Sequence, residues 1–142
     1  MKVRPSLRRR CRDERGAAAV EFALVSLVFF TLLFGTLQFG LWFWAWQQSA
    51  HAAREASRFA AVYPACSTGI SDKGEEALDG APVTSRAVSV GAAPTLVGDP
   101  ITVTVTAQTI DLGFFDFFTP GITKEATSRV ENIPSGDQCP PP

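Results

Sequence analysis

GAAAVEFALVSLVFFTLLFGTLQFGLWFWAW, residues 16–46, is the longest apolar run in the chain and the strongest guide to its architecture. No charged side chain occurs from Phe22 to Trp46, and Glu21 lies at the beginning of the run. About 20 apolar residues in a helix span the ~30 Å hydrocarbon core of a bilayer. The run therefore predicts one transmembrane helix over residues 17–46, with the lipid bilayer around it.

The charges on the two sides of this run are uneven, although the net charge of the 142-residue chain is only −1. Seven of the 13 Lys and Arg residues lie within residues 1–16, whereas most acidic residues follow the run. Basic residues beside a span stay on the cytoplasmic side. We therefore expect a cytoplasmic N-terminus. A basic arm could also bind nucleic acid, but its place directly against the span favours a topology signal and no nucleic-acid partner.

The helix is predicted to continue beyond the bilayer. Residues 47–63 contain no Gly or Pro and many Ala, which favours helix, and Tyr63-Pro64 predicts its end. A helix over residues 17–63 would be roughly 70 Å long, so residues 47–63 would protrude. Small side chains at helical spacing could contact either a neighbouring helix or the chain's own domain. They are Ala50, Ala53, Ser57, Ala60 and Ala61.

Residues 64–139 are predicted to form a small extracytoplasmic β-rich domain, followed by a proline tail at 140–142. Strict alternation of apolar residues with threonine indicates a strand over 101–107. Weaker strand patterns cover 84–90 and 124–130, and residues 71–79 favour a short helix capped by Ser71 or Asp72. The predicted fold class is α+β, in which a long N-terminal transmembrane helix extends outward and carries a small antiparallel sheet of three or four strands.

Four phenylalanines lie close together between the second and third predicted strands. Such a cluster usually fills a core, but it could also form a patch at the membrane edge or for a partner. These residues are Phe114, Phe115, Phe117 and Phe118.

The junction between the basic segment and the span contains Gly16, Ala17, Glu21 and Phe22. An acidic side chain at membrane depth is costly and usually faces a protein partner, although Glu21 could also stay wet among the headgroups. This arrangement is that of a prepilin-peptidase site, in which a basic leader ends in Gly, and four residues, Glu-Phe and a long apolar helix follow. Residues 1–16 are then a leader cut from Ala17, and Glu21 can pair with the terminal amine of a neighbouring subunit.

GAAAVEFALV, the following span and AAREASRFAA resemble the TadE-like family of the tight-adherence (Tad, or Flp) pilus system. The resemblance also includes Cys66, the ITVTVT strand and FFTPGITKEATSRVE, so it extends from about residue 12 to residue 139. It implies a minor pilin or pseudopilin in the bacterial cell membrane that assists assembly of a type IVb-like surface pilus in adhesion or secretion. The partners that it implies are a prepilin peptidase, other pilins or pseudopilins and the inner-membrane assembly platform.

The same resemblance assigns roles to individual residues. Gly16 would be the last residue of the leader, and Glu21 with Phe22 would form the processing and assembly motif. Major Flp pilins often carry Tyr after this Glu, and they are much shorter than this chain. Both departures favour an accessory role over the main pilus shaft.

The three cysteines fit the predicted topology. Cys11 lies in the leader and would stay cytoplasmic and reduced, whereas Cys66 and Cys139 lie outside, where disulfides persist. We expect these two to be bridged, which would stabilise the small domain by roughly 4 kcal/mol.

Enzyme functions find little support in the sequence. His51 is the one histidine and is expected to be a solvated helix residue. No Cys-x-x-Cys pair, two-histidine metal spacing or phosphate-binding Gly-rich loop occurs. We therefore predict no enzyme, no cofactor and no metal. An acidic group is expected to form a solvated helix face, with a weak cation site as the alternative. It comprises Asp72, Glu75, Glu76 and Asp79.

Two other functions stay open at this point. An uncleaved single-pass anchor could carry an adhesion or scaffold module with the same topology. A secreted binding domain could instead be released at Ala50-His51-Ala52 by a conventional signal peptidase. The apolar region of a signal peptide is about 7–15 residues long, which is shorter than this run.

Overall fold

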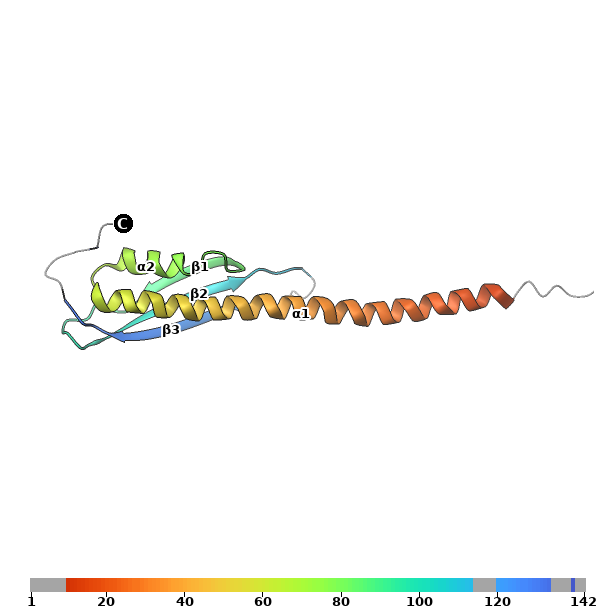
Figure 1. Cartoon of the computed structure of the whole chain (residues 1–142), viewed down its shortest axis with the longest axis horizontal. Coiled ribbons are helices and arrows are strands. Elements are labelled where there is room, and N and C mark those ends of the chain that lie inside the picture. The colour runs from red at the N-terminus through yellow and green to blue at the C-terminus, as the bar shows by residue number, and fades with distance from the viewer. Residues whose placement is uncertain (1–9, 114–119, 134–138, 140–142) are drawn as a thin grey trace, which may run out of the picture. The chain divides into compact units, whose positions relative to one another are not determined.

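The structure is a computed structural model that describes residues 10–113, 120–133 and 139. It contains α1 (Arg10–Val62), α2 (Ser67–Glu76), β1 (Val83–Val90), β2 (Pro100–Thr109) and β3 (Ile122–Arg129), as Figure 1 shows. The chain forms two compact units, residues 1–37 and residues 38–142, and α1 runs through both. The α+β class is therefore confirmed. The four clustered phenylalanines, at 114, 115, 117 and 118, lie outside the described residues.

Helix α1 begins earlier than the sequence indicated. It starts at Arg10, because arginine is a good helix former and a single Gly16 costs only about 1 kcal/mol. It ends at Val62, next to the end predicted from Tyr63-Pro64, and the Tyr63 amide donates to the Phe59 carbonyl at 2.9 Å. The predicted continuation of the helix is thus part of one unbroken element.

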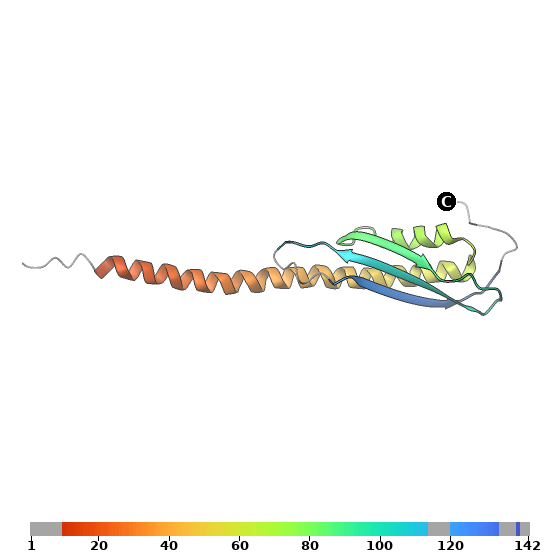
Figure 2. The ribbon, with the colours of Figure 1, turned by 180° about the vertical axis from the view of Figure 1, so that it is seen from behind.

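The three strands form an antiparallel sheet in the order β1-β2-β3, which can be followed in Figure 2. In its central register, Val88 of β1 lies opposite Val105 of β2, which lies opposite Lys124 of β3. The predicted strands at 84–90, 101–107 and 124–130 are confirmed, with each end shifted by at most a few residues. No fourth strand occurs among the described residues.

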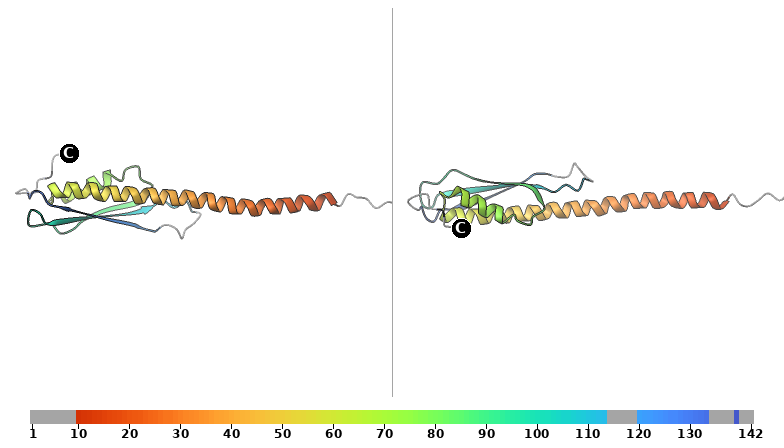
Figure 3. Two further views of the ribbon diagram at one scale, coloured as in Figure 1. Left: turned by 60° about the horizontal axis from the view of Figure 1, so that its bottom comes forward. Right: turned by 90° about the horizontal axis from the view of Figure 1, so that it is seen from above.

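The sheet domain is a two-layer structure, in which the C-terminal part of α1 and the short α2 cover one face of the sheet (Figure 3). The alternation in β2 places Ile101, Val103 and Val105 on this face, where all three are fully buried. All three pack in clusters with alanines of α1, and the cluster of Ile101 and Val103 also contains Ile70 of α2. Because the opposite face carries the threonines of β2, the period-2 pattern alone fixes which side is the core.

The small-residue stripe of α1 packs on the chain's own domain. Ala53, Ser57, Ala60 and Ala61 are buried, and Ala50 is half-buried. The Ser128 hydroxyl of β3 donates to the Ser57 hydroxyl at 3.0 Å. Small side chains let the helix approach the sheet closely, so they explain this packing without a second helix.

Helix α2 was predicted over 71–79, but it covers Ser67–Glu76, so its predicted beginning was wrong. The proposed caps lie inside the helix, and Cys66 precedes it without a side-chain capping bond. Tertiary packing explains the shift. A Cβ placed on Gly74 would lie 2.8 Å from Val88 and 3.4 Å from the Cβ of Ala56. Only glycine allows α2 to sit this close to β1 and α1.

Candidate functional site

The N-terminal part of α1 exposes almost all of its large apolar side chains. Phe22 is 73% exposed, Leu27 68% and Leu32 67%. The most apolar stretch of this helix is nowhere buried against the rest of the described chain. A protein in water cannot leave such a surface uncovered at low cost. The helix is long and apolar enough to cross a membrane, and we take it as the membrane anchor.

The hydroxyl groups in this segment are satisfied within the helix itself. The Thr31 Oγ1 donates to the carbonyl of Leu27 at 2.8 Å, and the Thr36 Oγ1 donates to the carbonyl of Leu32 at the same distance. Unpaired polar groups are costly in lipid, where no water can replace the missing bond. These two threonines therefore suit a hydrocarbon environment.

Gly16 and Ala17 lie within the first turns of α1 and are exposed. A Cβ placed on Gly16 would meet no atom within 4 Å. The fold of this chain does not demand glycine at position 16, so a requirement for it would have to come from something that binds there. Glycine also weakens the helix locally by about 1 kcal/mol relative to alanine, which eases unwinding of the bond to Ala17.

Glu21 and Phe22 follow on the same exposed segment. Glu21 is the only charged residue in the sequence from Gly16 to Trp46. It lies one helical turn beyond Ala17, and no hydrogen bond or ion pair within the described part of the chain involves it. A carboxylate placed there, beside a long apolar surface, is available to a cationic group of another molecule.

Aromatic residues gather where the exposed segment meets the sheet domain. Phe39, Phe43 and Trp44 are about half exposed, whereas the indole nitrogen of Trp42 is buried without a partner among the described residues. The ammonium of Lys124 lies 3.6 Å from the centre of the Trp46 ring, a cation–π contact that joins β3 to α1. Tryptophan and other aromatic residues are typical of the membrane–water interface.

At the other end of the domain, Cys66 and Cys139 are joined by a disulfide, with their Cα atoms 5.2 Å apart. Cys66 is buried between α1 and α2, and a Cβ on Gly69 would lie 2.7 Å from its sulfur. The bridge closes a segment with a sequence separation of 73 residues. It therefore ties the C-terminal part of the chain to the corner between the two helices.

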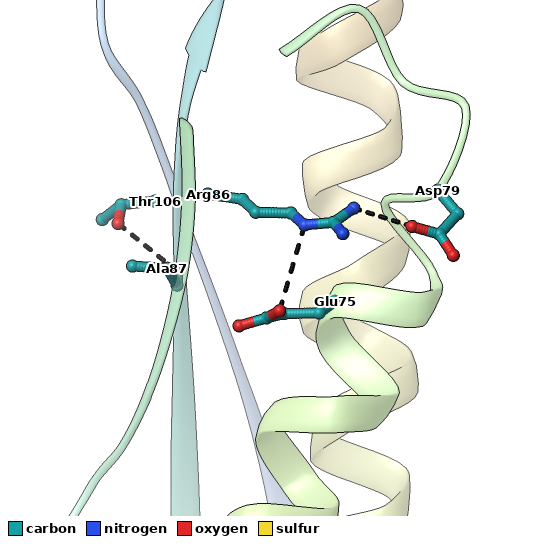
Figure 4. A network of polar contacts seen from close by, with 5 residues as sticks. All are labelled: Glu75, Asp79, Arg86, Ala87 and Thr106. Carbon is teal, nitrogen blue, oxygen red and sulfur yellow. Dashed lines mark hydrogen bonds and ion pairs between the residues drawn. The ribbon is translucent and has the colours of Figure 1, made fainter. Parts of the chain in front are cut away.

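Three of the four acidic residues on and after α2 are paired with basic side chains, and Figure 4 shows Glu75 and Asp79 beside Arg86. Arg86 of β1 donates to Asp79 at 2.8 Å and lies 4.0 Å from Glu75. Lys73 donates to Glu76 at 2.7 Å, and this hydrogen bond and the negative charge of Glu76 raise the pKa of Lys73. Asp72 and His51 are exposed. In the described ranges no group of three His, Cys, Asp or Glu side chains could hold a metal ion.

These features define a class of protein, a small α+β domain anchored by a single apolar helix. Residues 16–58 match the family model described as TadE-like protein, so this segment of the chain is similar to that family, as its sequence suggested. The matched segment contains Gly16, Glu21 and Phe22. It ends before Cys66 and the sheet, so it is shorter than the resemblance drawn from the sequence. No curated protein and no solved structure gives a significant match to the chain.

Proposed function

We propose that this protein is a TadE-like minor pilin or pseudopilin with a structural role in assembling a Tad (Flp) surface pilus. The observation that carries the proposal is the coincidence of two findings on one segment. The TadE-like match begins at Gly16 and covers the apolar helix. On that helix Gly16, Glu21 and Phe22 are exposed, and a Cβ placed on Gly16 would meet no atom within 4 Å.

The first step of this function is removal of residues 1–16. A prepilin peptidase cuts between Gly16 and Ala17 on the cytoplasmic side, where the basic residues of the leader hold the N-terminus. The product begins at Ala17 and carries a new α-amine at the end of the apolar helix. The absence of a side chain at Gly16 gives the peptidase access to the backbone.

The second step is association in the membrane. The Glu21 carboxylate of one subunit pairs with the α-amine of a neighbouring pilin, since both groups are costly in lipid alone and offset part of that cost together. The apolar helix crosses the membrane from Ala17, and the part of α1 after Leu37 carries the disulfide-bonded domain on the extracytoplasmic side. Other pilins or pseudopilins and the inner-membrane assembly platform are the partners.

The test is the N-terminal residue of the protein extracted from membranes of cells with an active prepilin peptidase. We expect Ala17 for the natural chain and the uncut leader for Gly16→Leu. Gly40→Leu is the matched control, because a Cβ on Gly40 also meets nothing within 4 Å. It should be cut normally. An uncut leader in all three proteins would contradict the processing step and leave a plain single-pass anchor.

A secreted domain released after Ala52 is the weaker alternative. Ala52 and Ala53 are both buried in the core beside Leu78 and Val105. A cut at this point would divide the helix on which the sheet packs. A mature protein that begins at Ala53 would nevertheless establish that route.

A further inference from the structure

The loop that follows β2 exposes two apolar side chains on a backbone that is held in place. Ile110 is 38% exposed and Leu112 39%. The amide of Ile110 donates to the carbonyl of Pro82 at 3.1 Å, and the amide of Gly113 donates to the Asp111 carboxylate at 2.8 Å. The loop therefore presents its apolar groups in a defined conformation.

Gln38 of α1 binds this loop through both ends of its side-chain amide. Its Nε2 donates to the carbonyl of Ile110 at 3.1 Å, and its Oε1 accepts from the amide of Leu112 at 3.3 Å. Gln38 is only 3% exposed, so the two bonds are largely shielded from water. Together with the bonds to Pro82 and Asp111, they satisfy the amides of Ile110, Leu112 and Gly113 and the carbonyl of Ile110, which lowers the cost of placing the loop in a region poor in water.

The position of Gln38 in the chain identifies what the loop meets. About 20 helical residues cross the ~30 Å hydrocarbon core, so a span that begins at Ala17 ends close to Leu37. Gln38 directly follows Leu37. A group that is hydrogen-bonded to Gln38 therefore lies close to the point where the chain leaves the bilayer, whatever the orientation of the sheet. Phe39 and Phe43, the exposed aromatic residues that come next, suit the same interfacial depth.

We propose that the Ile110–Gly113 loop, held by Gln38, rests on the lipid headgroups as a second membrane contact of the domain. The occupant of this surface is the bilayer interface, and the inference rests on the membrane anchoring proposed above. Ile110 and Leu112 face the interface, while the Asp111 carboxylate stays at headgroup level. The contact restrains the domain against the membrane before the subunit enters an assembly.

The opposite end of the sheet provides a matched control. Leu96, in the connection between β1 and β2, is 66% exposed and is also held by a hydrogen bond, from its amide to Asp99 at 3.1 Å. Strand β2 separates the two loops by roughly 30 Å, at about 3.3 Å per residue. Exposure alone would make Leu96 the better membrane contact, whereas the bonds to Gln38 favour Leu112.

The experiment uses the full chain with Cys11→Ser and one added cysteine, Leu112→Cys or Leu96→Cys, which carries an environment-sensitive fluorophore. Each protein is reconstituted into phosphatidylethanolamine–phosphatidylglycerol vesicles, with a spin-label quencher either on the headgroup or deep in the acyl chain. We expect the label at 112 to be quenched at least about twofold more than the label at 96. The headgroup quencher should be the stronger one.

Flotation of the same vesicles separates the possible failures. Equal quenching at 112 and 96 in proteins that float would overturn the loop contact and leave the anchor intact. Proteins that do not float would overturn the anchor and the loop contact together. Because the vesicles contain no other protein, stronger quenching at 112 reports lipid and not a protein partner.

The positioning role of Gln38 is tested with Gln38→Leu, and Gln47→Leu serves as control because Gln47 is exposed. We expect the quenching at 112 to fall to the level at 96 only in Gln38→Leu. Unchanged quenching in that variant would overturn the role of Gln38.

Discussion

The two parts of α1 use side-chain size in opposite ways. From Gly16 to Leu37 the large residues, such as Phe22 and Leu27, are exposed. From Gln38 to Val62 the small ones, such as Ala52 and Ala56, are fully buried. In a water-soluble protein the large apolar residues would occupy the core. The reversal follows from two solvents, because lipid covers the first part and the sheet covers the second.

The largest expected difference between the two parts concerns their cysteines. Cys139→Ser removes the bridge to Cys66, and chain entropy for a loop of this length predicts a loss of about 4 kcal/mol in the free energy of unfolding. Cys11→Ser, in the predicted leader, should leave that free energy unchanged. Denaturant unfolding of the oxidised full chain in detergent measures both. Equal stability of the two variants, with both thiols free in protein isolated from cells, would show that the bridge does not form there.

The next difference concerns two glutamates, Glu21 in the proposed membrane segment and Glu55 on the surface of the domain. Glu21→Gln should lower association with other pilins by about 3 kcal/mol, more than a hundredfold, since it removes one partner of an ion pair in lipid. Glu55→Gln is the control, because Glu55 lies 4.0 Å from Arg58 and is 48% exposed. Exposed pairs contribute little. Co-purification of pilus subunits measures association. An equal loss in both variants, or in neither, would contradict the proposed role of Glu21.

A third comparison enlarges one alanine in each part. Ala56 is fully buried and its Cβ lies 3.4 Å from the position a Cβ would take on Gly74, so Ala56→Leu should destabilise the domain by about 1–3 kcal/mol. Ala23 is exposed on the apolar segment, and Ala23→Leu should leave domain unfolding unchanged. Near-UV circular dichroism during unfolding reports the domain. A domain that tolerates Leu at 56 would show that α1 and α2 are packed less tightly than described.

The sequence predicted correctly the elements that have a clear pattern or stop signal within a few neighbouring residues. The alternation from Ile101 to Ala107 fixed a strand and its buried face, and Tyr63-Pro64 fixed the end of α1 to within one residue. The beginning of helix α2 was misplaced because Ser71 and Asp72 are favourable caps and Gly69 is a poor helix former. The helical state of Gly69 depends on packing against Cys66 and against Phe59 of α1, which lie outside α2. Propensity alone could not supply those contacts.

Part of the candidate site could be predicted from the sequence, and the contacts of Gln38 could not. The anchor and the positions of Gly16 and Glu21 follow from charge and hydropathy along the chain, which need no tertiary information. The two hydrogen bonds of Gln38 join residues more than 70 positions apart. A lone glutamine inside an apolar run was the signal that could have drawn attention to it, because an amide at that depth needs partners.

The smallest expected effect concerns the ion pair of Lys73 and Glu76 on the surface of α2. The carboxylate of Glu76 raises the pKa of Lys73 above its ordinary value of 10.5. A raised pKa in the folded state means that the pair stabilises the domain fully below that value and loses its effect as the pH rises through the folded pKa. The contribution is small because both side chains are exposed.

Above a pH of about 10.5, the unfolding midpoint of the natural chain should therefore approach that of Glu76→Gln, while at neutral pH it should lie slightly higher. The unfolding midpoint of the domain, followed between pH 7 and about 12, measures the convergence. Vesicle flotation at the same pH values should not change, because no lysine occurs in the membrane segment. A difference between the two proteins that persists unchanged at high pH would assign the effect of Glu76 to the helix and not to its pairing with Lys73.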